Sequence, residues 1–214
     1  MSVSIENFSL LKDVIRIIFW IIVINALTMS VPILQLKKRK KISLKYSINV
    51  GNRIDFQKGN KCAAFAMAYV LRYFNIDADG NTLYKHFLCK FPSGSVTPLG
   101  IRIMLRKYNL ETKYRKGNID NLKVDLSNGV PVIVFIHSSL NSKRSHFVPV
   151  TGYDENGFYI AESIEKLSNI TDGNGISNRK VTYKDFKIMW NIKKIYMPLY
   201  SNTYIVVSSK KDKI

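Results

Sequence analysis

The stretch that most constrains this chain is a polar loop that ends where an apolar run begins. Residues 55–61 are mostly polar and contain a glycine, and Cys62 follows them directly. From Ala63 to Phe74 the sequence is mostly apolar, and its apolar positions recur every three or four residues. This period predicts a buried helix whose first residue is Cys62. The chain is thus expected to place a thiol at the start of a helix.

A helix start is a setting in which a thiol can become reactive. The free N–H groups and the positive dipole end stabilise the thiolate, and a paired imidazolium can lower the thiol pKa from about 8.5 to ~3–4. Gln57 precedes Cys62 by five residues and could donate an amide hydrogen bond toward the same point. With the N–H of Cys62 it would form an oxyanion hole. The alternative is that Cys62 is only a small apolar residue in a buried helix, where free cysteine is common.

Composition narrows the class of protein. The net charge of +18 suits an anionic partner such as nucleic acid, acidic lipid or a cell-wall polymer. The lysines outside residues 37–41 are spread along the chain, however, and the sequence has no zinc-finger spacing, RNA-binding aromatic signature or phosphate-binding loop. We therefore expect no nucleic-acid partner, no metal and no cofactor. The two cysteines, Cys62 and Cys89, both fall in helix-like segments and are expected to be free thiols.

The N-terminal part predicts a membrane anchor. After an N-terminal tail at residues 1–13, residues 14–36 form a run of mostly apolar positions. About 20 such residues cross a hydrocarbon core of ~30 Å as a helix. A cleaved signal peptide is the competing interpretation, but no Ala-x-Ala-like site ends the run. We expect a single uncleaved transmembrane helix over residues 14–36.

A basic cluster follows that run. Lys37 to Lys41 lie in a juxtamembrane linker at residues 37–45, and they outnumber Lys12 and Arg16 on the other flank. The positive-inside rule then predicts a cytoplasmic C-terminal domain, although the signal anchor of an exported protein could break the rule. The same cluster could contact anionic lipid headgroups.

In the rest of the chain, the spacing of apolar residues changes halfway along from a helical to a strand-like pattern. A strand is expected over residues 42–50, followed by helices at 62–75, 82–91, 98–108 and 119–126, with a turn at 79–81. The second half predicts strands at 130–136, 146–153, 158–162 and 204–207, a polar loop at 138–145 before the second of them, a loop at 168–179 and a capped helix at 182–190. Asn156-Gly157 is a strong hairpin signal. Helices first and an antiparallel sheet second make an α+β fold.

A cysteine nucleophile needs a base that is close in space, and the chain has three histidines. His86 lies inside a predicted helix, and His137 ends a predicted strand. His146 opens the next strand after a polar loop, where an imidazole can be held by the sheet and still face a cleft, so it is the preferred base. An acid that orients the imidazole is expected at Glu162 or at Asp154, because register alone does not decide which of them faces it.

Several stretches together resemble a known family. They are Gln57 before Cys62, the helix start Cys-Ala-Ala-Phe-Ala, the stretch from His146 to Asp154, Tyr159-Ile-Ala-Glu162-Ser, residues 181–186 with Trp190, and residues 204–207. In this order they resemble the bacterial papain-like cysteine peptidases of the bacteriocin-processing, double-glycine-leader type and their stand-alone relatives. The resemblance covers about residues 45–208, and the ordered combination is more specific than any single stretch.

The resemblance implies roles for matching residues only. It implies that Cys62 is the nucleophile, His146 the general base and then acid, and Gln57 the oxyanion-hole donor. The family usually has aspartate followed by proline as its third element, whereas this chain has Glu162-Ser163, and Ala63 stands where glycine is common. The implied fold is a papain-like domain at residues 46–208 with a tail at 209–214, and its active site lies in the groove between the lobes.

The sequence thus predicts a single-pass, membrane-anchored cysteine peptidase that acts on a peptide or protein. Processing of double-glycine leaders is one option for its substrate. One alternative is an inactive papain-like module that binds peptides or leader sequences at the membrane without cutting them. Another is a basic adaptor that binds the membrane surface through Lys37 to Lys41.

Overall fold

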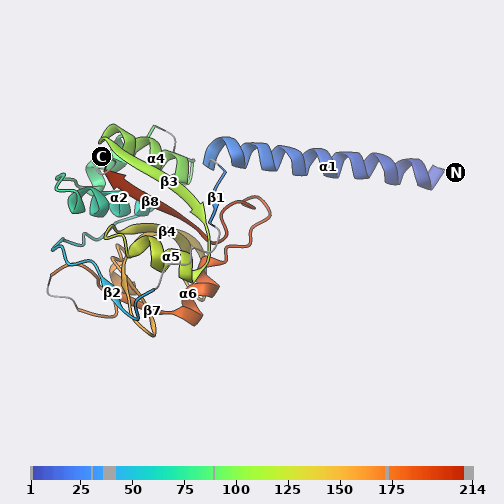
Figure 1. The fold of residues 1–214 in the computed structure, drawn as a ribbon. Coiled ribbons are helices and arrows are strands. Elements are labelled where there is room, and N and C mark those ends of the chain that lie inside the picture. Colours follow the sequence, from blue (N-terminus) through green and yellow to red (C-terminus); the bar gives the residue numbers. More distant parts are fainter. Residues whose placement is uncertain (1, 30, 36–41, 89, 172–173, 210–214) are drawn as a thin grey trace.

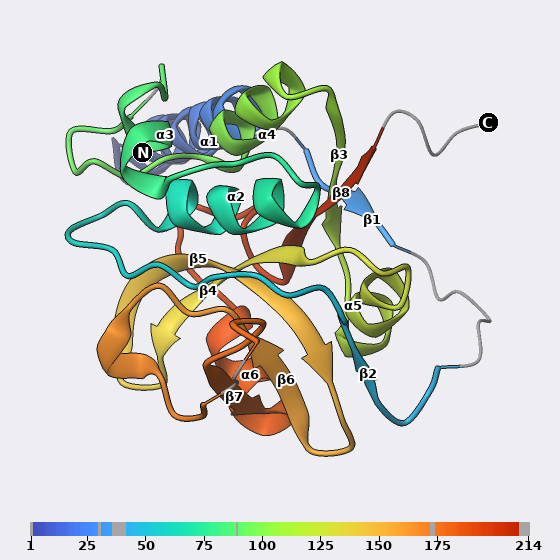
Figure 2. The ribbon, with the colours of Figure 1, turned by 90° about the vertical axis from the view of Figure 1, so that its left-hand side faces the viewer.

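An eight-stranded sheet with helices on both faces forms the centre of the structure (Figures 1 and 2). The structure is a computed structural model that describes residues 2–29, 31–35, 42–88, 90–171 and 174–209. Its helices are α1 (Ser2–Met29), α2 (Cys62–Tyr73), α3 (Gly80–Lys85), α4 (Pro98–Lys107), α5 (Ile119–Leu126) and α6 (Tyr183–Trp190), with a 3-10 turn at Glu165–Leu167. Its strands are β1 (Ile33–Leu34), β2 (Tyr46–Ser47), β3 (Leu110–Lys116), β4 (Val132–Ser139), β5 (Ser142–Tyr153), β6 (Gly157–Ile160), β7 (Arg179–Thr182) and β8 (Thr203–Ser209).

The sheet is built around the long hairpin of β4 and β5. The strand order is β1-β3-β8-β4-β5-β6-β7, and β2 pairs with β5 off this path. The named strand pairs are antiparallel except for β1 with β3, which is parallel. Antiparallel order follows from short connections, such as the turn that carries Asn156 between β5 and β6. The predicted α+β fold class is confirmed.

Alternation along β4 divides the core into two halves. Ile133 and Phe135 pack with the apolar faces of α2 and α4, whereas Val132, Val134 and Ile136 pack with those of α5 and α6. Successive side chains of a strand point to opposite faces, so a continuous apolar run marks a strand that is covered on both. The run at residues 130–136 is therefore the centre of the sheet, as its sequence predicts.

Polar side chains cap the first turns of three helices. Thr97 Oγ1 accepts a hydrogen bond from Gly100 N at the start of α4, and Thr182 Oγ1 accepts one from Asp185 N at the start of α6. At α5, Asn118 and Asn121 exchange side-chain to backbone hydrogen bonds as a capping box. These bonds satisfy N–H groups that have no partner inside the helix.

Four local predictions need correction. The helix expected at 82–91 is the shorter α3, because Asp79 caps it by accepting from Thr82 N and places Gly80 in its first turn. The strand expected at 42–50 is reduced to β2. The polar loop expected at 138–145 is mostly the end of the β4–β5 hairpin. Strand β3 was not predicted, because its sequence LETKYRK is exposed or half-buried at most positions and lacks an apolar run.

The prediction of a transmembrane helix at 14–36 is wrong in its bounds and is not supported. Helix α1 ends at Met29, and the end of the apolar run instead forms β1, which pairs with β3. Lys12, Asp13 and Arg16 interrupt the apolar surface of α1. Within the part of the chain that the structure describes, no helix is long and apolar enough to cross a membrane.

Some predictions fall outside the described residues. Lys37 to Lys41 are among residues 36–41, so the lipid contact and the cytoplasmic placement that rest on this cluster stay predictions. Cys89 also lies outside them, as does most of the predicted tail at 209–214. The predicted division of the chain into domains is likewise not tested.

Candidate active site

Cys62 lies where the sequence predicts, at the first residue of α2. The residue before the helix, Lys61, makes no side-chain capping bond to the N–H groups of the first turn. Cys62 is half-buried and lines a cleft, while the rest of α2 from Ala63 to Leu71 is buried. The helix core therefore fixes the position of a thiol that remains open to the cleft.

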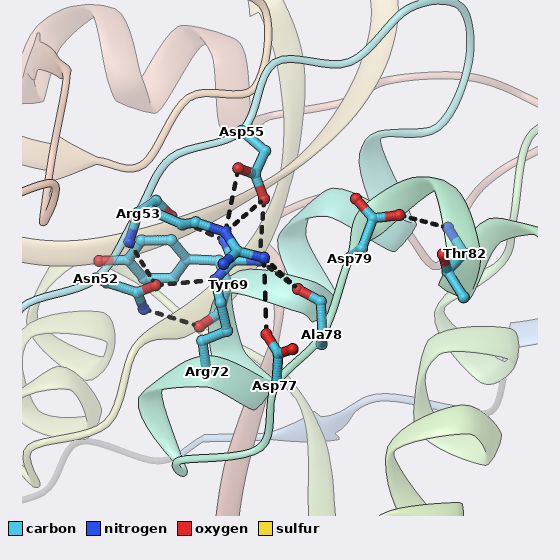
Figure 3. A network of polar contacts seen from close by, with 9 residues as sticks. All are labelled: Asn52, Arg53, Asp55, Tyr69, Arg72, Asp77, Ala78, Asp79 and Thr82. Atoms are coloured by element: carbon cyan, nitrogen blue, oxygen red, sulfur yellow. Dashed lines mark hydrogen bonds and ion pairs between the residues drawn. The ribbon is translucent and has the colours of Figure 1, made fainter.

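The loop before Cys62 is held against the last turn of α2 by Arg72 (Figure 3). Arg72 Nη1 lies 3.0 Å from Asp55 Oδ2, and its other nitrogens donate to Asn52 Oδ1 at 3.1 Å and to the Arg53 carbonyl at 2.8 Å. Asn52 Nδ2 donates in turn to the Tyr69 carbonyl at 3.0 Å. These bonds fix residues 52–55 on α2, and so they set where the chain reaches Gln57.

Gln57 is oriented at both ends of its amide. Its Oε1 accepts from Lys61 N at 2.9 Å, and its Nε2 donates to Ser163 Oγ at 2.9 Å. Its backbone N–H donates to the Ser163 carbonyl at 2.8 Å. Since an amide nitrogen carries two hydrogens, one remains beyond the bond to Ser163. Gln57 and Cys62 line the same cleft, so the two predicted oxyanion-hole groups are brought together.

His146 and Glu162 form a buried pair next to Cys62. His146 Nε2 lies 2.7 Å from Glu162 Oε1, and the two side chains are 2% and 0% exposed. The imidazole is also hydrogen-bonded to Cys62. Because Nε2 is engaged by the carboxylate, Nδ1 is the nitrogen left for the thiol. The structure thus brings Cys62, His146 and Glu162 into one chain of contacts.

The carboxylate of Glu162 is fully partnered. Oε1 also accepts from Ile164 N at 2.7 Å, and Oε2 accepts from Arg179 Nη1 at 2.8 Å. The backbone of Glu162 is held by the side chain of Asn178, which accepts from its N–H at 2.7 Å and donates to its carbonyl at 2.9 Å. Asp154, the other predicted acid, caps the β5–β6 turn and pairs with Lys180 instead. Between the two acids, geometry selects Glu162.

These contacts shift the pKa values in the directions that an ion pair needs. Burial alone would raise the pKa of Cys62, but the hydrogen bond and charge of His146, with the N–H groups of Phe147 and Ala63, lower it below its usual range. Burial alone would lower the pKa of His146, but Glu162 and Cys62 raise it to about 9. Burial would raise the pKa of Glu162, and His146, Ile164 N–H and Arg179 lower it.

The cleft that holds these groups has a volume of about 770 Å³. Small-molecule and peptide sites of enzymes commonly fall in the range of ~300–1,000 Å³. The other histidines are elsewhere: His86 is exposed at the end of α3, and His137 lies on β4 outside the residues that line the cleft. In the described part of the chain, no group of three His, Cys, Asp or Glu side chains could hold a metal ion.

Sequence reasoning missed Arg179, Ser163 and Arg72. Arg179 ends the loop predicted at 168–179, but in the structure it opens β7 and is 7% exposed. A buried arginine signals an acidic partner, but its burial was not predicted from the sequence. Ser163 stood out only as a departure from the family pattern. Arg72 lies near a helix end, where basic residues are common, so its sequence position alone gives no signal of this role.

Comparison with solved structures shows the fold. A protein solved as a C39-like peptidase from Bacillus anthracis aligns with a TM-score of 0.59 and 16% identity, covering 78% of this chain and 99% of that one. The peptidase domain of Streptococcus ComA, a bifunctional ABC transporter involved in quorum sensing, aligns with a TM-score of 0.54 and 16% identity, covering 74% and 99%. A double glycine motif protease from an AMS/PCAT transporter, solved with its leader peptide, aligns with a TM-score of 0.49 and 14% identity, covering 78% and 100%.

The sequence itself identifies the family. No curated protein matches it significantly. Residues 44–194, which include Cys62, His146 and Glu162, match the peptidase C39-like family. That stretch spans the candidate site and most of the sheet, and the predicted resemblance is confirmed: the chain belongs to the peptidase C39-like family.

Proposed function

We propose that the protein is a cysteine-type peptidase that hydrolyses peptide bonds in the cleft beside Cys62. The observation that carries this proposal is the chain of contacts from Cys62 through His146 to Glu162, with Gln57 on the same cleft. A nucleophile, a base oriented by an acid, and a donor for the oxyanion are the parts that acyl transfer requires. Membership of a peptidase family supports the same reaction.

The first half of the reaction is acylation. The Cys62 thiolate attacks the peptide carbonyl, and the charge that develops on its oxygen is stabilised by Gln57 Nε2–H and the N–H of Cys62. The imidazolium of His146 then donates its proton to the leaving amine, and the C–N bond breaks. Glu162 keeps the imidazole ring oriented and stabilises its charged form through the bond at Nε2.

The second half is deacylation. Neutral His146 takes a proton from water, and the water oxygen attacks the thioester carbonyl of the acyl-enzyme. Collapse of this intermediate expels the Cys62 thiolate and releases the acid product. The imidazolium and thiolate that remain are the pair present at the start, so the cycle closes without any further group.

Labelling with iodoacetamide across pH tests the proposal. Because His146 lowers the pKa of Cys62, we expect fast labelling of Cys62 well below pH 8, mapped by mass spectrometry. A His146→Ala variant should follow an ordinary thiol titration near pH 8.5. Peptide hydrolysis needs the protonated imidazole, so it should fall as the pH rises through about 9. Cys62→Ala should abolish both labelling and hydrolysis at this site, and Cys89→Ala should leave both intact.

The opposite result would favour the rival function. If wild-type Cys62 reacts slowly and titrates like a free thiol, the chain is a papain-like module that binds peptides without cutting them. Equal labelling of the two cysteines at low pH would also contradict the assignment of Cys62 as the nucleophile.

A further inference from the structure

Three cations line the cleft. Lys143, Arg144 and Lys194 line the same cleft as Cys62 and His146, and no Asp or Glu belongs to the described residues that line it. Elsewhere in the described chain three arginines are paired with carboxylates: Arg72 with Asp55, Arg115 with Asp125, and Arg179 with Glu162. The described residues place no carboxylate within ion-pair distance of the three cleft cations.

Lys194 is held against the strand that carries His146. Its Nζ donates to Ser145 Oγ at 2.9 Å and to the Lys143 carbonyl at 3.2 Å. Ser145 directly precedes His146 on β5, and Ser145, His146 and Lys194 all line the cleft. On the neighbouring strand β4, burial lowers the pKa of His137, and the positive charge of Lys194 lowers it further.

Arg144 reaches from the sheet to the loop of the nucleophile. It precedes His146 by two residues on β5, so both side chains lie on the same face of the strand, about 7 Å apart along it. Its Nη2 donates to the Gly59 carbonyl at 3.1 Å and to the side chain of Asn60. The described contacts use Nη2 alone, and a guanidinium has five N–H donors in a planar fork that matches a carboxylate.

A second, independent feature of the cleft is a buried hydrogen-bond acceptor that has no partner in the described structure. Asn25 of α1 lines the cleft and is 5% exposed. Its Nδ2 donates to the Tyr196 carbonyl at 2.9 Å, which ties α1 to the segment that carries Lys194. Its Oδ1 has no hydrogen-bond partner in the described structure. A buried acceptor left unpaired is costly, and a peptide N–H would satisfy it.

The position of these cations fixes which part of a substrate they would meet. In the proposed reaction His146 gives its proton to the leaving amine, so the leaving group lies on the His146 side of the attacked carbonyl. Lys194 and Arg144 extend from that side along β5. They would therefore face the residues that follow the scissile bond.

We propose that Lys194 and Arg144 form a carboxylate-binding subsite, and that the preferred substrates are peptides with a carboxylate just after the scissile bond. The carboxylate is either an Asp or Glu side chain or the end of a short peptide. This inference rests on the proposed function, because it uses the direction of the leaving group.

Two alkylating agents of nearly equal shape test the subsite without a known substrate. Iodoacetate carries a carboxylate and iodoacetamide a neutral amide, and the Cys62 thiolate displaces iodide from both. We expect the ratio of their labelling rates at Cys62 to fall roughly fivefold in Lys194→Gln and in Arg144→Gln, because each variant removes one charge near the reagent. Dividing by the iodoacetamide rate removes any change in the reactivity of the thiol itself, and Lys194→Arg should keep the wild-type ratio.

The control variant is Lys113→Gln, which removes an exposed charge on β3 away from the cleft. Its ratio should equal that of the wild type, and salt should reduce the iodoacetate preference of the wild type. A ratio that is the same in the wild type and both cleft variants would overturn the subsite. Slow iodoacetamide labelling of the wild type would instead count against the proposed function.

Protection experiments then distinguish the two sources of carboxylate. N-acetylglutamate α-amide offers only a side-chain carboxylate, N-acetylalanine only a terminal one, and N-acetylglutamine α-amide is the neutral control. Protection of Cys62 from iodoacetamide by the first alone assigns acidic side chains, and protection by the second alone assigns a chain end. Protection by neither, or equally by the neutral control, would overturn the subsite as a substrate contact.

Discussion

The two sides of the candidate site are built in different ways. On the sheet side, His146 and Glu162 are almost fully buried, and each carboxylate oxygen of Glu162 has a partner. On the loop side, Gln57 is half-buried, and the loop is held by Arg72 and by an Asp55 side chain that is 30% exposed. The sheet side therefore depends on buried charge, whereas the loop side depends on hydrogen bonds close to solvent.

Because of this difference, proton transfer and oxyanion stabilisation in the proposed reaction depend on different kinds of interaction. Proton transfer by His146 depends on a charge pair in a low-dielectric interior, where each partner is costly to remove. Oxyanion stabilisation by Gln57 depends on the geometry of a loop, which neighbouring bonds set. The two sides meet in consecutive residues, because Glu162 contacts His146 and Ser163 contacts Gln57.

Breaking the sheet side should have the largest effect. Glu162→Gln keeps the shape of the side chain and an oxygen for Arg179, but removes the charge that faces His146. We expect peptide hydrolysis to fall by up to roughly 10⁴, the loss seen when the orienting acid of a triad is neutralised. Burial lowers the pKa of His146 and Glu162 offsets this to about 9, so the alkaline limb of the rate profile should move to lower pH.

Asp154→Asn is the matched control for that variant. Asp154 is the other acid that the sequence offered for this role, and it bonds Lys180 and Tyr159 instead of His146. It should leave the pH limb in place and change the rate little. The same loss of rate in both variants, with no shift of the limb in Glu162→Gln, would mean that Glu162 supports only the fold.

Breaking the link between the sides should have an intermediate effect. Ser163→Ala removes the acceptor for Gln57 Nε2 but keeps the Ser163 carbonyl that binds the Gln57 N–H. A hydrogen bond of this kind contributes about 1 kcal/mol, so we expect turnover to fall roughly fivefold to tenfold. Alkylation by iodoacetamide forms no oxyanion and should be unaffected. A drop in both rates would show that Ser163 acts on the thiol, not on the oxyanion donor.

The sequence predicted the local parts of the site better than the contacts between them. Cys62 at a helix start follows from the period of the apolar run, and Thr97 and Thr182 cap helices as their neighbours suggest. These features depend on residues within one or two turns of chain. Pairing across the sheet depends instead on residues far apart in the sequence. A register slip of one residue would have turned Glu162 away from the face that carries His146.

Arg179 shows where local reasoning ends. It opens β7 and binds Glu162, which follows the end of β6, so the identity of its partner depends on how β6 pairs with β7. The transmembrane prediction failed for a related reason. Apolar residues that would suit a bilayer are instead divided between α1 and the short strand β1, whose partner β3 has no clear signal in the sequence.

Breaking the loop side alone should have the smallest effect. Asp55→Asn weakens the ion pair with Arg72 but leaves the Arg72 bonds to Asn52 and to the Arg53 carbonyl. A partly exposed pair contributes up to about 1 kcal/mol, so the urea midpoint should fall slightly and turnover roughly twofold to threefold. Asp77→Asn is the control, because Asp77 is 94% exposed and lies 3.7 Å from Arg53, and it should change neither (Figure 3). If Asp55→Asn lowered turnover as much as Glu162→Gln does, the loop side would be as sensitive to charge as the sheet side, and the contrast between them would not hold.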